Sequence, residues 1–284
     1  MAPSNYSYKY FNVTFPQEHV AHVEINRPEK LNAFVEEMWL NLGQIFNKLS
    51  HDPDVRCVVL SGAGDRAFTA GLDVQAASQG SILGASGTKL DVARTATGIR
   101  RHIFEFQSCI TAIEKCEKPV ISILHGYTYG LGLDIASSTD IRLSTTMTLF
   151  SVKEVDIGLA ADIGTLSRLP KCVGNQSWVK DICLTARQFS SEEALRFGLV
   201  SGVFGDKAEA LREGFRIAGV VAGKSPVAVQ GTKSIVNYSR DHSVEEGLNY
   251  TAIWNAAMVQ TEDVKAAMLA GLQKDKKKPT FSKL

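Results

Sequence analysis

Residues 118–134 read KPVISILHGYTYGLGLD, a stretch that joins an apolar strand to the first turn of a helix. Its first part, 119–124, is short and apolar, which is typical of a strand buried inside a sheet. Glycines punctuate the rest, and glycine lets the backbone turn tightly or approach a ligand closely. A second stretch of similar design, FTAGLD at 68–73, comes after another apolar strand at 56–61. Two strand–turn–helix units of this kind indicate an α/β core.

Strands and helices alternate on both sides of these turns up to about residue 205, and helices dominate afterwards. Further strands are predicted near 19–25, 140–143, 148–151 and 198–204, and helices near 35–50, 93–116, 174–183 and 192–197. The stretch 75–92 is rich in Gly, Ser and Ala and is interpreted as a loop or flexible lid. From Lys207 the pattern is helical, with a break at Ser225-Pro226. We therefore expect an α/β core over 1–206 and a helical region over 207–284.

The overall composition excludes several classes of protein. A net charge of +1 over 284 residues supplies no field that would gather nucleic acid or an anionic membrane surface. The five cysteines form no C-x-x-C pair, so we expect reduced, buried thiols in an intracellular protein, with no disulfide frame and no metal site. No run reaches the length of a transmembrane helix, and the N-terminal residues lack the pattern of a secretory signal.

The last three residues carry a targeting prediction. Ser282, Lys283 and Leu284 match a peroxisomal import address and follow a lysine-rich run at 274–278. We therefore expect a peroxisomal protein that is bound by the import receptor.

Three carboxylates, those of Asp134, Glu154 and Asp162, lie in stretches that are otherwise apolar and rich in glycine. Such acids are costly to bury in ionised form, so their pKa values are expected to rise. A carboxylic acid with a raised pKa is suited to proton transfer at neutral pH. Structural explanations also exist, because Asp134 suits the first turn of a helix and Asp162 suits an N-cap.

Glu154 has a structural explanation of its own. It lies two residues from Asp156, so in an extended segment the two side chains share a face, where either can pair with Lys153 or Arg168. The six histidines stand apart from any serine or cysteine nucleophile motif, and no P-loop, G-x-S-x-G or H-E-x-x-H motif occurs.

The two glycine turns offer a site for a negatively charged oxygen. A helix that has just begun leaves N–H groups unpaired, and its dipole favours negative charge there. Two N–H groups that converge on one oxygen form an oxyanion hole, able to hold the enolate of a thioester. The alternative is that both stretches are merely tight strand-to-helix turns.

In this order and spacing, the motifs resemble the enoyl-CoA hydratase/isomerase (crotonase) superfamily over nearly the whole chain. The matching stretches are NRPEKLNA at 26–33, AFTAGLD at 67–73, the stretch 118–134, and DIR at 140–142. Within the superfamily the likeness is to the Δ3,5-Δ2,4-dienoyl-CoA isomerases. It is carried by KEVDIGLAADIGTL at 153–166, SPVAVQG at 225–231, YSRDHS at 238–243 and FSKL at 281–284.

The resemblance implies a role for each matching position. The backbone N–H groups of Leu72 and Leu131 would form the oxyanion hole. Glu154 and Asp162 would transfer the protons, and Asp134 would support them with its charge. The residues expected to bind CoA are Ala70, whose carbonyl would receive the adenine amino group, together with Gly71, Asp73 and Lys30. Relatives usually carry three glycines where this chain has Gly-Leu-Gly at 130–132, but a backbone donor needs no particular side chain.

The resemblance further implies the conversion of a 3,5-dienoyl-CoA into a 2,4-dienoyl-CoA without metal or redox cofactor. Glu154 would remove the proton from C2 and Asp162 would deliver one at C6, although the two roles are exchangeable. Alternatives are an enoyl-CoA hydratase that uses Asp134 and Glu154, a Δ3-Δ2-enoyl-CoA isomerase that uses Glu154 alone, and a non-catalytic RNA-binding or scaffold relative. A hydratase would carry glutamate at 134, so the aspartate weakens that alternative.

The same resemblance implies a spiral of ββα units with a C-terminal helical region that mediates homotrimers, often paired into hexamers. Apolar residues after 207 are candidates for a seam between subunits, or for core within one subunit: Val259, Val264, Met268 and Leu272.

Overall fold

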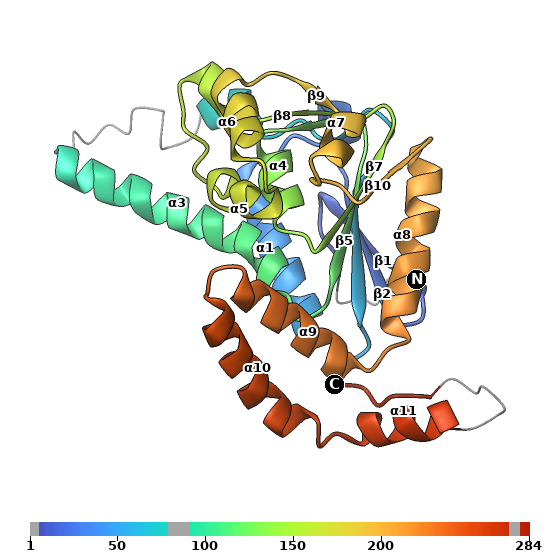
Figure 1. Cartoon of the computed structure of the whole chain (residues 1–284). Helices are drawn as coiled ribbons and strands as arrows, with labels where there is room; N and C mark the ends of the chain where they lie inside the picture. Colours follow the sequence, from blue (N-terminus) through green and yellow to red (C-terminus); the bar gives the residue numbers. More distant parts are fainter. Residues whose placement is uncertain (1–5, 79–90, 273–278) are drawn as a thin grey trace.

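The computed structural model describes residues 6–78, 91–272 and 279–284, and it contains two sheets (Figure 1). The first sheet has the strand order β1-β2-β3-β5-β7-β10, with β1 antiparallel to β2 and the remaining pairs parallel. Its strands are β1 Phe11–Gln17, β2 Val20–Ile25, β3 Cys57–Gly62, β5 Val120–Leu124, β7 Ile141–Thr145 and β10 Gly202–Phe204. The second sheet, in the order β4-β6-β8-β9, consists of β4 Ala67–Thr69, β6 Tyr127–Tyr129, β8 Leu149–Ser151 and β9 Phe189–Ser190.

The chain alternates between the two sheets in a regular way. Strands β3, β5 and β7 belong to the first sheet, and each is followed within a few residues by its short successor, β4, β6 or β8, in the second. A helix comes after each pair before the chain returns to the first sheet. This succession is the spiral of ββα units that the resemblance implies, and it places the turns after β4 and β6 next to each other because those strands are paired in parallel.

The helices surround this spiral, with α1 and α3 running side by side (Figure 1). Their bounds, together with two short 3₁₀ helices η1 and η2, are η1 Pro28–Lys30, α1 Glu36–His51, α2 Val74–Ser78, α3 Val92–Lys115, α4 Leu131–Ser137, η2 Glu154–Ile157, α5 Thr165–Cys172, α6 Gln176–Thr185, α7 Ser191–Arg196, α8 Lys207–Ala222, α9 Pro226–Ser239, α10 Val244–Met258 and α11 Glu262–Leu272.

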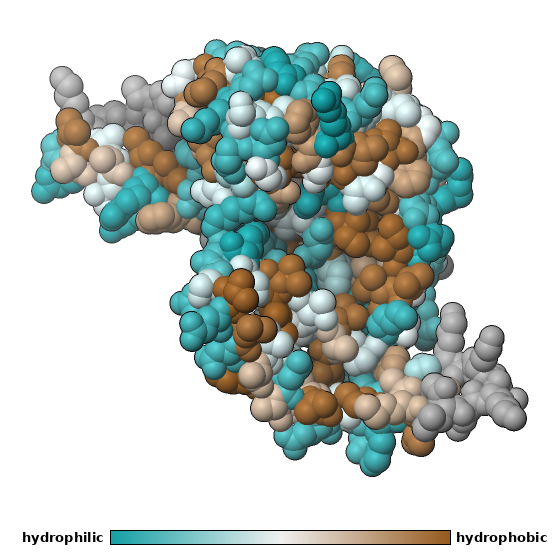
Figure 2. All heavy atoms as spheres, viewed as in Figure 1, coloured by the Kyte–Doolittle hydropathy of each residue, from teal (hydrophilic) through white to brown (hydrophobic). Residues whose placement is uncertain are grey.

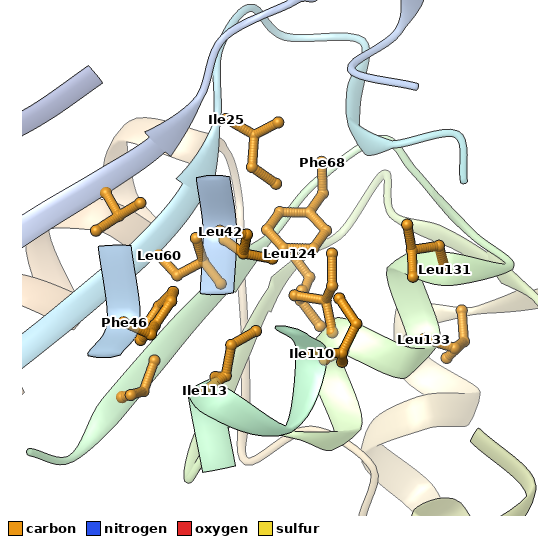
Figure 3. Close-up of a cluster of buried hydrophobic side chains, with 14 of the residues drawn as sticks. Ile25, Leu42, Phe46, Leu60, Phe68, Ile110, Ile113, Leu124, Leu131 and Leu133 are labelled. Atoms are coloured by element: carbon orange, nitrogen blue, oxygen red, sulfur yellow. The ribbon is translucent and has the colours of Figure 1, made fainter. Parts of the chain in front are cut away.

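Two apolar cores hold the first sheet between helices. The larger core joins the strands to α1, α3 and α4, and Figure 3 shows side chains of these elements pointing toward one another. The smaller core lies on the other face of the same strands, where α8 packs against them. Its members include Val59, Ile121 and Ala218. Leu131 and Leu133 belong to the larger core, so burial of apolar surface fixes the start of α4.

Most elements predicted from the sequence are confirmed, and the differences have local causes. Strand β1 was not predicted, because it is an edge strand with Pro16 near its end. Helix α5 was also not predicted, since it contains Pro170. The predicted loop at 75–92 is wrong at its start, where α2 continues to Ser78, and its part at 79–90 lies outside the described residues.

The C-terminal helices α9, α10 and α11 follow one another at one end of the molecule (Figure 1). Figure 2 shows apolar side chains gathered on these helices. Those most exposed are Val236, Val244, Leu248, Ile253, Val259, Met268 and Leu269. Of the predicted seam, Val259 and Met268 are exposed and Val264 is half-buried, while the side chain of Leu272 and the lysine-rich run at 274–278 lie outside the described part of the chain. No helix in the described ranges is both long and apolar enough to span a membrane.

Candidate active site

In the first glycine turn, the backbone N–H of Leu72 points away from the segment that pairs with the turn. Phe34 pairs with the turn as in a parallel sheet: its N–H donates to the Gly71 carbonyl, and its carbonyl accepts from the Asp73 N–H, at 2.8 and 2.9 Å. Because backbone groups alternate in direction along such a segment, the N–H of Leu72 faces the opposite side. Gly71 has φ +97°, a conformation that other residues rarely adopt.

The second glycine turn lies against the first. Leu131 is the first residue of α4, so its N–H has no acceptor within the helix. A Cβ atom added to Gly71 would lie 3.6 Å from the nitrogen of Leu131 and 3.0 Å from the carbonyl oxygen of Tyr129. The backbone at Gly71, next to Leu72, therefore lies close to Leu131, so the two predicted oxyanion-hole residues belong to neighbouring segments that are about sixty residues apart in the sequence.

A buried hydrogen-bond network fixes the first turn. Asn32 is 1% exposed, and its side-chain amide donates to the carbonyls of Ala63 and Ala67, both at 2.9 Å. The hydroxyl of Thr69 donates to the Asn32 carbonyl and accepts from the Gly71 N–H. These groups were not singled out in the sequence, although asparagine within a tight turn is a usable signal because it tolerates the left-handed conformation that Asn32 adopts, with φ +56°.

Glu154 faces the second turn as a largely unpaired carboxylate. Its Oε1 would lie 3.2 Å from a Cβ atom added to Gly130, the residue that precedes Leu131. Its Oε2 is buried and has no hydrogen-bond partner within the described ranges. Burial, reinforced by the charge of Asp134, raises the pKa of Glu154 to about 7. A group with this pKa is able both to accept and to donate a proton near neutral pH.

Asp134 is the most buried of the three acids, at 1% exposed. Its Oδ1 accepts from the backbone N–H of Thr165 at 2.6 Å and from the hydroxyl of Thr165 at 2.8 Å. Burial raises the pKa of Asp134 to about 6, although the two bonds from Thr165 oppose the increase. Asp134 thus caps the start of α5 and also places its charge beside Glu154.

Asp162 lies on the segment that leads into α5 and is partly exposed. Burial raises its pKa, and its charge in turn raises the pKa of both Glu154 and Asp134. Its backbone carbonyl accepts a hydrogen bond of 2.5 Å from the side-chain amide of Gln107 on α3. All three predicted acids are thereby gathered into one electrostatic cluster.

Two structural explanations offered for the acids are wrong. Asp162 is not an N-cap, because α5 begins after Gly164 and Asp134 accepts the hydrogen bond at its start. Glu154 and Asp156 do not share a face of an extended segment, because η2 is a 3₁₀ helix. Lys153 forms its ion pair with Asp156, at 2.9 Å, and not with Glu154.

Of the predicted CoA-binding residues, Ala70, Gly71 and Asp73 belong to the first turn and Lys30 ends η1. Asp73 forms an ion pair of 2.8 Å with Arg27 and accepts from the Ala76 N–H, so its carboxylate stabilises the turn. Hydrogen bonding to Ala76, together with the Arg27 charge, holds the pKa of Asp73 below its ordinary value. Ala70 donates its N–H to the Leu31 carbonyl, and Lys30 is exposed at the end of η1.

The C-terminal tripeptide is exposed, and the chain just before and within it contacts Arg56 and Asp54. Arg56 donates to the carbonyls of Phe281 and Ser282, at 2.7 and 3.3 Å. Lys283 pairs with Asp54, while Leu284 is exposed. The described residues contain one group with metal-ligand potential, at the side chains of Glu36, His102 and Glu105, but exposed acids of this kind are common without an ion.

The fold and this site together define the class of protein. The enoyl-CoA hydratase/isomerase family model matches residues 16–283, so the chain belongs to that family. A solved enoyl-CoA hydratase from Bacillus anthracis shares the fold, with a TM-score of 0.85 at 22% identity over 96% of this chain and 99% of that one.

Within the family, the chain is similar to proteins of one particular kind. It is 49% identical to the mitochondrial Δ3,5-Δ2,4-dienoyl-CoA isomerase of Rattus norvegicus, over 99% of this chain and 85% of that protein. It is 44% identical to the peroxisomal Δ3,5-Δ2,4-dienoyl-CoA isomerase of Arabidopsis thaliana, over 93% of each.

Proposed function

We propose that this protein is a Δ3,5-Δ2,4-dienoyl-CoA isomerase acting on acyl-CoA thioesters. One observation carries the proposal: the half-buried carboxylate of Glu154, whose Oε2 is buried without a hydrogen-bond partner in the described part of the chain, lies beside Gly130, the residue before Leu131. An acid at that place can exchange a proton with the carbon next to a thioester carbonyl held by Leu72 and Leu131. The likeness to dienoyl-CoA isomerases over almost the full chain supports the same reaction.

In the proposed reaction, one carboxylate takes the proton from C2 of a 3,5-dienoyl-CoA. The electron pair of the broken C–H bond spreads through the conjugated system and onto the thioester oxygen, where the two N–H groups stabilise it. The second acid gives its proton to C6, and the double bonds come to rest at positions 2 and 4. The thioester supplies the acidity at C2, so the reaction requires no metal and no redox cofactor.

Glu154 is assigned to C2 and Asp162 to C6, with Asp134 as a supporting charge. A pKa of about 7 leaves Glu154 substantially ionised at neutral pH, as a base requires. Burial raises the pKa of Asp162, which shifts it toward the protonated form that a proton donor needs. The reverse assignment remains the alternative, because burial and like charges act most strongly on Glu154 and favour its protonated form in the free site.

Hydration is the second candidate reaction, and the contacts of Asp134 disfavour it. Hydration through Asp134 and Glu154 would need both carboxylates to orient a water molecule. Oδ1 of Asp134 already accepts two hydrogen bonds from Thr165. Exposed apolar side chains beside the acids, Val155, Ile157 and Leu159, suit the acyl chain of either substrate.

The test uses purified protein with 3,5-octadienoyl-CoA, followed by the ultraviolet absorbance of the 2,4-dienoyl product, with hydration of a 2-enoyl-CoA measured in parallel. We expect rapid isomerisation, slow hydration, and loss of isomerisation in Asp162→Asn. Hydration that is fast and unaffected by Asp162→Asn, without isomerisation, would assign the protein to the hydratases. Inactivity in both assays would refute both reactions.

For CoA binding, Lys30 lies near the charge of Asp73 and is exposed, so its ammonium group is available to a phosphate. We assign the adenine contact to the Ala70 carbonyl beside the turn at Gly71. Lys30→Ala should raise KM for the CoA substrate and leave kcat unchanged.

A peroxisomal location is proposed from the tripeptide Ser282-Lys283-Leu284 and the peroxisomal plant relative, although the animal relatives with higher identity are named mitochondrial. A fluorescent fusion that keeps the tripeptide should enter peroxisomes, and one with Leu284 deleted should not. For assembly, the exposed apolar side chains of α9–α11 support a homotrimer or hexamer, which light scattering tests directly.

A further inference from the structure

Helix α3 presents three polar side chains to the acid segment at regular spacing. Gln107, Thr111 and Glu114 follow one another at intervals of four and three residues, so they lie on one face of the helix. Gln107 donates to the carbonyl of Asp162 at 2.5 Å. The other two bind Arg168 in the second turn of α5, through Thr111 Oγ1 at 2.8 Å and Glu114 Oε2 at 3.0 Å.

Arg168 also fills the space beside Gly164. Its side chain is 10% exposed. A Cβ atom added to Gly164 would overlap Nη1 of Arg168, so the guanidinium group packs directly on the backbone between Asp162 and Thr165. The same charge favours the ionised form of Asp134. The Arg168 side chain thus contacts the turn that carries Asp162, and its charge acts on Asp134, which accepts hydrogen bonds from Thr165.

Glu114, which binds Arg168, is itself bound by a second arginine. Oε1 of Glu114 lies 2.5 Å from Nη1 of Arg240, at the end of α9. Although burial acts against ionisation, Arg168 and Arg240 keep the pKa of Glu114 below its ordinary value. A planar guanidinium group with two fixed partners has little freedom to rotate, which suits it to hold a backbone segment in place.

We propose that Arg168 is a positioning residue, which holds the turn from Asp162 to Thr165 against α3 and so sets the place of the Asp162 carboxylate. Glu154 lies on η2 and is outside this arrangement. Loss of Arg168 should therefore displace one acid of the pair and leave the other in place. This inference rests on the proposed isomerase function.

The test compares Arg168→Met and Gly164→Ala with Asp162→Asn and Glu154→Gln, using two readouts on the same substrate. The first is isomerisation, and the second is exchange of the C2 proton with solvent deuterium, scored by mass spectrometry. The matched control is Lys233→Met, because Lys233 is a buried cation paired with Asp140 at 2.7 Å, near the beginnings of β5 and β7.

We expect Arg168→Met and Gly164→Ala to lower kcat at least about tenfold with KM nearly unchanged, and to reproduce the ratio of exchange to isomerisation seen in Asp162→Asn. Arg168→Lys should recover part of the loss. Lys233→Met should keep the wild-type ratio even where it lowers the melting temperature. Should Arg168→Met fail to fold, Gly164→Ala and Gln107→Ala carry the same expectation.

Two outcomes would overturn the inference. One is an equal fall of exchange and isomerisation in proportion to folded protein, and the other is loss of both activities in folded protein, as expected of Glu154→Gln. Failure of the proposed function is recognised separately, because the wild-type protein would then neither isomerise the dienoyl-CoA nor exchange its C2 proton.

Discussion

The two halves of the site differ in whether their polar groups have hydrogen-bond partners. The glycine turns offer backbone N–H groups, and the first of these turns is held by Asn32, Thr69 and the ion pair between Arg27 and Asp73. The acid half offers side-chain carboxylates, and one of them, Glu154, has its Oε2 buried with no hydrogen-bond partner among the described residues. The first half satisfies the polar groups that hold its turn, while the second leaves one carboxylate oxygen, Oε2 of Glu154, without a partner among the described residues.

The difference shows how a rigid element and a reactive element share one site. Preorganised donors stabilise charge because they need no rearrangement when the charge develops. A carboxylate that is fully hydrogen-bonded has a low pKa and is a poor base, whereas burial without partners raises its pKa toward neutrality. Asp134 lies between these cases, since Thr165 satisfies one oxygen while burial still raises its pKa to about 6.

The largest effect is expected from Glu154→Gln. The amide keeps the size of the side chain but cannot take a proton, so kcat for isomerisation should fall by about 10³-fold or more while KM and the melting temperature change little. Steady-state kinetics on the dienoyl-CoA measures this. Asp156→Asn is the matched control from the same 3₁₀ helix, and a comparable loss in that variant would contradict the assignment.

Gly71→Ala should have the next largest effect, because it acts on the rigid half. The added methyl group meets the Tyr129 carbonyl at 3.0 Å, and φ +97° is strained for alanine. We expect kcat to fall by about 10²-fold, the scale of losing one oxyanion donor. Gly98→Ala, with open space around its Cβ position on α3, is the control. Wild-type turnover in Gly71→Ala would exclude the turn as an oxyanion hole.

Asn32→Ala should affect stability more than chemistry. The substitution leaves the carbonyls of Ala63 and Ala67 without their donor inside the protein, which should lower the free energy of unfolding by about 2–4 kcal/mol. Chemical denaturation measures the loss. An unchanged midpoint would show that the network does not hold the turn.

Asp134→Asn should have the smallest effect on kcat and a diagnostic effect on pH dependence. The amide oxygen can still accept from Thr165, so the cap is retained, but the charge beside Glu154 is gone. Because that charge raises the pKa of Glu154, the acid limb of the kcat/KM profile should move to lower pH. A limb that stays near pH 7 would show that Asp134 has no electrostatic role.

The same variant should be more stable than wild type at high pH. A pKa of about 6 in the native state, above the ordinary value, means that the native protein binds more protons than the unfolded chain between about pH 4 and 6. Stability therefore falls as pH rises through this range, by up to about 3 kcal/mol for a difference of two pKa units. Chemical denaturation at pH 8 should show that Asp134→Asn regains part of the free energy of unfolding that the wild type loses.

The glycine turns and the three acids were predictable from the sequence because each is a local pattern. The contacts that make them a site were not, since they join distant residues: Thr165 with Asp134 across 31 positions, and Arg168 with Glu114 across 54. The predicted N-cap role for Asp162 failed for this reason, because local spacing does not reveal that a buried acid from α4 already occupies the start of α5.

The most direct measurement of the central claim is exchange of the C2 proton with deuterium oxide in Asp162→Asn and Glu154→Gln. If Glu154 acts at C2 and Asp162 at C6, Asp162→Asn should still exchange the C2 proton while isomerisation stops, and Glu154→Gln should lose both. Retention of isomerisation in both variants, at rates near wild type, would contradict the account.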